Sequence, residues 1–128
     1  MSVRDIPRGE WQAFLDQFSR EHRAWLASVD RFSPEAERHA EVSNRPLGGV
    51  TARTAGRRVV GIQIQFQPDS HAGRAVVVDA PSRLRVDQTA DGATQALEID
   101  NERGERTRIT LRVVAPPGLL DGVAPGEV

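Results

Sequence analysis

The chain of 128 residues contains no cysteine and no lysine, so that all 17 basic residues are arginine. The lack of cysteine excludes disulfides, thiolate nucleophiles and thiolate metal sites. The lack of lysine excludes Schiff-base chemistry and a phosphate-loop lysine. A GC-rich bacterial genome is the simpler explanation for this bias, and a need for planar, bidentate arginine contacts is the functional explanation.

Long apolar runs and an excess of one charge are also missing. The first residues, MSVRDIPRGEW, contain no apolar run of the kind found in signal peptides. No stretch approaches the roughly 20 apolar residues that span a bilayer. The net charge of −1 creates no global field toward nucleic acid or anionic lipid. We therefore expect a bacterial cytoplasmic protein that binds neither membranes nor nucleic acid, and whose partner is an unknown protein or a second copy of the chain.

The few aromatic residues gather near the N-terminus. Trp11, Phe14, Leu15 and Phe18 stand at the i, i+3, i+4 and i+7 positions of a helical stripe. This spacing predicts an amphipathic helix whose four apolar side chains form one buried face.

Most of the remaining chain is predicted to be strand. Arg23 to Phe32 alternates as a strand does but also continues the helical stripe, and we favour the strand. Gly48 and Gly49 are expected to bend or bulge a later strand. Besides Arg23–Phe32, strand signals occur at Glu41–Ser43, Pro46–Arg53, Val60–Phe66 and Arg74–Asp79.

The last third is predicted to be a three-stranded meander. Its strands are Arg83–Thr89, Thr94–Asp100 and Arg106–Val113. A two-residue turn at Asp91-Gly92 would set Ala90 opposite Ala93 and pair the first two strands. A three-residue loop, Glu102–Gly104, would pair the second and third, with Gly104 in the left-handed conformation.

This register aligns charged side chains on the outer face of the meander. The two rows are Arg85–Glu98–Arg108 and Arg83–Asp100–Arg106. The simpler interpretation is cross-strand ion pairing on a solvated face, at about 0.2–1 kcal/mol for each pair. The functional alternative is a ligand site in which the four arginines of these rows contact phosphate or carboxylate groups.

Two other polar groups are weaker candidates. Asp69-Ser70-His71 has the residue types of a catalytic triad, but neighbours in sequence rarely meet in the geometry that a triad requires. His39 with Glu35, Glu37 and Glu41 has metal-ligand chemistry but lies in a polar connector. We assign no catalytic residue, no metal ligand and no cofactor.

The chain also resembles a family of small bacterial proteins catalogued only as a domain of unknown function. The resemblance covers about residues 5 to 113 and implies a fold in which a helix precedes a sheet, without implying any catalytic residue, cofactor or substrate. The residues that carry it are Ile6-Pro7, Trp11 with Phe14, Phe18-Ser19-Arg20, Trp25-Leu26, Pro46-Leu47, Leu84-Arg85-Val86 and Ala96-Leu97-Glu98-Ile99.

These patterns together predict one α+β domain over residues 1–114 and a flexible Pro/Gly-rich tail over residues 115–128. The N-terminal helix is expected to pack on a curved, mainly antiparallel sheet of six or seven strands that can close in part into a barrel. The leading functional expectation is a non-enzymatic binding or interaction module. The alternative is a small-ligand or nucleotide-binding half-barrel with arginine anion contacts, and a hydrolase with an unrecognised carboxylate site ranks third.

Removing residues 117–128 should leave the melting temperature nearly unchanged, because proline and glycine give this segment little apolar surface to bury. Thermal melts of the full-length and shortened chains test this expectation. A shortened chain that melts well below the full-length chain would instead indicate that Leu119 and Leu120 pack on the domain.

Overall fold

A computed structural model describes residues 2–35, 37–67 and 75–112 of the chain. The expected tail and the Asp69-Ser70-His71 segment lie outside these residues. One α-helix, a single 3-10 turn and eight strands make up the described part. In chain order they are β1 (Ser2–Asp5), η1 (Arg8–Glu10), α1 (Trp11–His22), β2 (Leu26–Phe32), β3 (Arg38–Ala55), β4 (Arg58–Phe66), β5 (Ala75–Asp79), β6 (Pro81–Gln88), β7 (Thr94–Asn101) and β8 (Arg106–Arg112).

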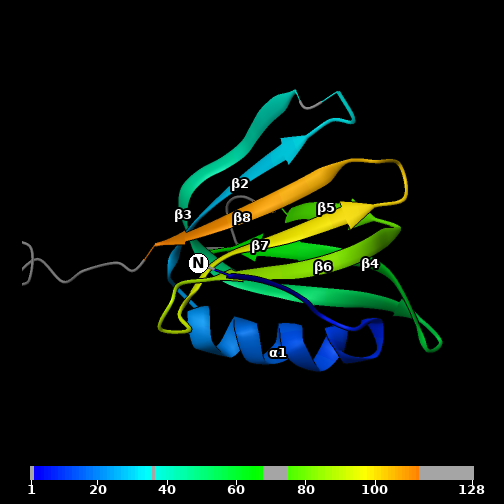
Figure 1. The fold of residues 1–128 in the computed structure, drawn as a ribbon, viewed down its shortest axis with the longest axis horizontal. Coiled ribbons are helices and arrows are strands. Elements are labelled where there is room, and N and C mark those ends of the chain that lie inside the picture. The colour runs from blue at the N-terminus through cyan, green and yellow to red at the C-terminus, as the bar shows by residue number, and fades with distance from the viewer. Residues whose placement is uncertain (1, 36, 68–74, 113–128) are drawn as a thin grey trace, which may run out of the picture.

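The strands form one curved antiparallel sheet in the order β1-β6-β7-β8-β2-β3-β4-β5, with α1 lying along it (Figure 1). A mainly antiparallel sheet with one helix is therefore confirmed. The expected six or seven strands were too few, and the sheet is not closed, since β1 and β5 are its two edges. The helix is short, at 12 residues, and follows a strand rather than opening the chain. Strand β1 was not predicted, because SVRD is short and mostly polar.

The 18-residue strand β3 bends the sheet. Its first part pairs with β2 as far as Pro46, and its second part pairs with β4 from Leu47 onward. The register shifts between Leu47 and Gly49, as the glycine pair predicted. A Cβ atom on Gly48 would stand 3.2 Å from the backbone oxygen of Gln65, so this close approach favours glycine. Two separately predicted strands are thus one continuous strand.

Helix α1 buries one side against the sheet, but the buried residues differ from the predicted four. Trp11, Leu15 and Phe18 are buried, whereas Phe14 is only half-buried at the edge of the core. His22 is buried one turn beyond Phe18 and donates from Nδ1 to the Phe18 carbonyl oxygen at 2.8 Å. The helix then ends, and Arg23–Phe32 is strand from Leu26 onward, as favoured.

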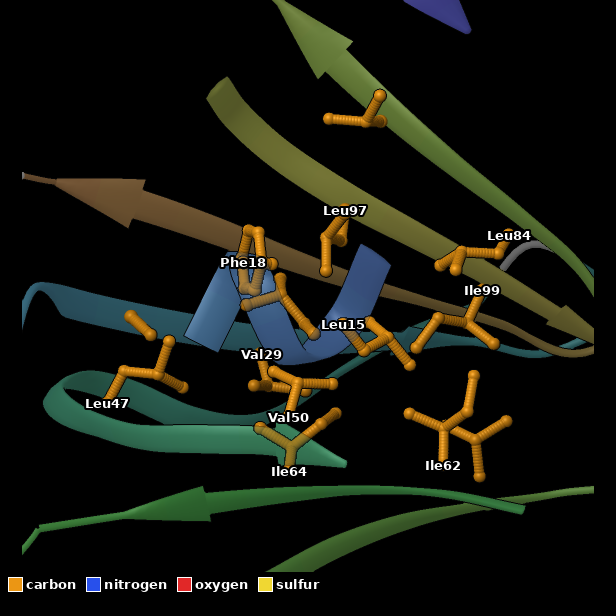
Figure 2. Close-up of a cluster of buried hydrophobic side chains, with 14 of the residues drawn as sticks. Leu15, Phe18, Val29, Leu47, Val50, Ile62, Ile64, Leu84, Leu97 and Ile99 are labelled. Atoms are coloured by element: carbon orange, nitrogen blue, oxygen red, sulfur yellow. The ribbon is translucent and has the colours of Figure 1, made fainter. Parts of the chain in front are cut away.

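The core is formed by the inward side chains of the curved sheet together with this helix face. Leu15 and Phe18 of α1 point into a cluster that both halves of the sheet surround (Figure 2). The strand residues labelled there are Val29, Leu47, Val50, Ile62, Ile64, Leu84, Leu97 and Ile99. Each is at most 1% exposed, which makes this cluster the main source of stability.

The meander has the predicted register but one wrong loop. Val86 is opposite Leu97 and Leu84 is opposite Ile99, as expected. The first loop has three residues rather than two. The Thr89 N–H donates to the carbonyl of Ala93, so Thr89 is opposite Ala93 and Ala90 lies in the loop. A register shift next to Asp87 absorbs the extra residue and restores the pairing.

The second loop of the meander is as predicted. The Asn101 N–H donates to the carbonyl of Glu105, which encloses three loop residues, and Gly104 has a φ of +85°. A left-handed residue at this place is what a three-residue hairpin loop requires.

Leu15→Ala should lower the free energy of unfolding by about 2–5 kcal/mol, because it opens a cavity at a site with no solvent access. Phe14→Ala should cost clearly less, about 1–2 kcal/mol, since the ring is only half-buried. Urea denaturation of both variants measures the two values. Equal losses would contradict the placement of Phe14 at the edge of the core.

Candidate functional site

The outer face of β6, β7 and β8 carries the two charged rows that the register predicted. Arg85 is opposite Glu98, and Glu98 is opposite Arg108. In the second row Arg83 is opposite Asp100, and Asp100 is opposite Arg106. Successive strand residues point to opposite faces, so the register that buries the leucines and isoleucines also gathers these charges outside.

Ion pairs join the two rows into one cluster. The Glu98 carboxylate contacts Arg85 at 3.3 Å and also Arg108. The Asp100 carboxylate contacts Arg85 at 3.2 Å and Arg106 at 2.9 Å. Arg85 therefore links both acids, and each acid in turn holds a second arginine. We name Arg85, Asp87, Glu98, Asp100, Arg106 and Arg108 the charged cluster.

The expectation of a fully solvated face is wrong for the centre of this cluster. The side chains of Arg85 and Glu98 are only 15% and 16% exposed, and Asp87 is 7% exposed. Packed arginines can cover their neighbours with their apolar stems, which lowers solvent access to the charged groups. Ion pairs in such a setting are less screened than the surface pairs that were expected.

Arg83 departs from the predicted row. Its guanidinium contacts Asp5 of β1 through Nε at 2.7 Å and Nη2 at 3.0 Å, rather than forming an ion pair with Asp100. This pair is open to solvent, with side chains 54% and 56% exposed. The bidentate hydrogen bond from Arg83 lowers the pKa of the Asp5 carboxyl.

Carboxylate contacts also fix the charge of the outer arginines. The hydrogen bond to Asp100 raises the pKa of Arg106. Burial acts to lower the pKa of Arg108, but the hydrogen bonds to Asp87 and Glu98 outweigh burial and raise it. Both arginines are therefore permanent cations at any physiological pH.

A hollow of about 660 Å³ lies on this face. Three of the four predicted ligand-binding arginines, Arg83, Arg106 and Arg108, line it, while Arg85 lies outside its lining. Glu98 and Asp100 also line it. The structure thus brings the predicted arginines together, with Arg85 serving as the link between the two acids.

Phe32 and Asp5 belong to this site but were missed in the sequence. Phe32 lines the hollow and is opposite Arg106 across the β2–β8 pair. Asp5 reaches the site through the β1–β6 pair. Both pairings join segments more than 70 residues apart, and no local turn signal reports such a pairing.

The carboxylates near His39 do not gather around it as metal ligands in the described residues. His39 and Glu41 lie in β3, and within the described ranges no three metal-binding side chains come together. In those same ranges no helix is long and apolar enough to cross a membrane.

The fold and the site define a small antiparallel-sheet protein with one helix and a charged outer face. The chain belongs to a family of unknown function, DUF5335, whose model matches residues 2–117. No curated protein and no solved structure matches the chain. The resemblance found in the sequence is therefore confirmed, and it assigns no activity.

Glu98→Gln should lower the free energy of unfolding by about 1–3 kcal/mol, because it removes a largely buried charge shared by two arginines. Asp5→Asn removes a solvent-exposed partner and should have a much smaller effect that salt suppresses further. Urea denaturation at low and high salt compares the two variants. Losses of the same size would contradict the difference in burial between the two ion pairs.

Proposed function

We propose that this chain is a non-enzymatic binding or interaction module of the bacterial cytoplasm. Its contact surface is the charged hollow over β6, β7 and β8. The partner meets the guanidinium groups at the rim of the hollow, while the carboxylates hold those groups in place.

The observation that carries this proposal is the unequal exposure of the arginines. Arg83 and Arg106 line the hollow with side chains 54% and 44% exposed, whereas Arg85 is 15% exposed. The exposed guanidiniums are held at Nε by a carboxylate. A long side chain loses less conformational entropy on binding when it is already held in position, and this favours recognition.

The role of the acids supports binding over catalysis. Asp87, Glu98 and Asp100 each contact at least one arginine, and Glu98 and Asp100 each contact two. General acid–base catalysis uses a carboxyl group that can reach a substrate proton. Carboxylates occupied by guanidiniums are better suited to positioning cations.

A small-ligand or nucleotide-binding half-barrel is the second candidate. The volume of the hollow, about 660 Å³, supports it, since small-molecule pockets span about 300–1,000 Å³. An aromatic side chain, Phe32, also lines the hollow. Arginine contacts to an anion would then provide recognition.

A matched pair of double variants tests the contact surface. Full-length tagged protein is recovered from the native cell, and bound proteins and small molecules are identified by mass spectrometry. The double variant Arg83→Gln with Arg106→Gln should recover at least about tenfold less of the bound partner, because charged hydrogen bonds are removed. Arg57→Gln with Arg58→Gln makes the same charge change at exposed positions where β3 turns into β4, and this variant should retain the partner.

Thermal melts of both double variants establish that each is folded. Recovery of the same molecules with both variants, in the same amounts, would contradict the proposed surface.

A further inference from the structure

The charges on the outer face alternate in sign across five strands. Along one line of directly opposed residues, Asp5, Arg85, Glu98, Arg108 and Asp30 follow one another from β1 to β2. Every arginine in this line therefore has an acid on each side. Opposite charges at directly opposed positions stabilise a sheet.

The neighbouring line has the same alternation from β6 to β8 but a different residue type in β2. Arg83, Asp100, Arg106 and Phe32 follow one another from β6 to β2. Phe32 stands where alternation would place an acid, as Asp30 does in the first line. Directly opposed residues lie on the same face, so the ring is beside Arg106. Both residues line the hollow.

This break leaves Arg106 with unused donors. Its Nε donates to Asp100 at 2.9 Å. Neither terminal nitrogen of Arg106 donates a hydrogen bond to any group among residues 2–35, 37–67 and 75–112. Arg108 provides the contrast within the same strand, because its two terminal nitrogens donate to Glu98 and Asp87.

Arg106 shares its acid, Asp100, with Arg85. The hydrogen bond to Asp100 raises the pKa of Arg106, and the positive charge of Arg83 is a smaller influence in the opposite direction. An oxyanion bound in the hollow would offset the repulsion between these two guanidiniums.

We propose that Arg106 and Phe32 form a subsite for a small organic anion, in which a carboxylate or phosphate group is attached to a flat apolar group. The two terminal nitrogens of Arg106 donate to the anion, and the apolar group packs on the ring of Phe32. This inference rests on the proposed function and specifies the chemistry of its ligand.

The charged cluster limits the affinity and the class of ligand. It holds three arginines and three acids, so its formal charges cancel. The attraction for an anion is therefore local to Arg106 rather than spread over the face. A single oxyanion with an apolar neighbour fits this arrangement better than a polyanion.

Titrations of the full chain followed by ¹H–¹⁵N NMR test the subsite. Benzoate and phenyl phosphate are the probes; acetate and inorganic phosphate lack the ring, and benzyl alcohol lacks the charge. We expect at least one probe to bind about tenfold or more tightly than its matched controls, since the ring and the charge each contribute. The preferred probe distinguishes a carboxylate from a phosphate ligand.

Three variants assign the binding to these residues. Arg106→Gln should lower the affinity for the probe about tenfold or more. Phe32→Leu should lower this affinity toward that of the ring-free control. Phe32→Glu should abolish binding, because the new carboxylate completes the alternation and occupies Arg106. Arg58→Gln, at an exposed position in β4, is the control and should bind as the parent does.

Probes that bind no better than their controls, or that bind Arg106→Gln as well as the parent, would overturn the subsite. If the partner recovered from cells still depends on Arg83 and Arg106 in that case, the proposed contact surface stands and only the small-anion inference fails. Thermal melts establish that each variant is folded. If Phe32→Glu does not fold, the two single variants Arg106→Gln and Phe32→Leu decide the outcome.

Discussion

The register of β6, β7 and β8 is the constraint on which both the core and the outer face depend. A strand repeats every two residues, so one choice of pairing sends Leu84, Leu97 and Ile99 inward and Arg85 and Glu98 outward. A slip by one residue would bury the charges and expose the core at the same time. The charged cluster therefore supports the same pairing that the apolar core requires.

This agreement between the two faces made the meander predictable from the sequence. Apolar and charged side chains matched across the pairs at once, so the register was right although the first loop was wrong. The loop between Thr89 and Ala93 has one more residue than a two-residue turn, and the shift beside Asp87 compensates. Side-chain pairing is thus a stronger determinant of register here than the turn sequence.

Non-local pairing explains what the sequence did not reveal. Strand β1 and the contacts of Asp5 and Phe32 depend on segments that are distant in the chain. The continuity of β3 depends on changing partners from β2 to β4, which polar residues near its start concealed. The candidate arginines could be named in advance. Their division into a largely buried Arg85 and an exposed Arg106 at the rim of the hollow required the three-dimensional packing.

The central claim is that the Arg85–Glu98 contact is a structural part of the sheet, whereas the exposed arginines at the rim of the hollow serve recognition. A double-mutant cycle with Arg85→Gln, Glu98→Gln and the double variant tests it most directly. We predict a coupling free energy of about 0.5–3 kcal/mol from urea denaturation, the range for residues in one ion-pair network. A coupling energy near zero would contradict the account, because the two side chains would then contribute independently.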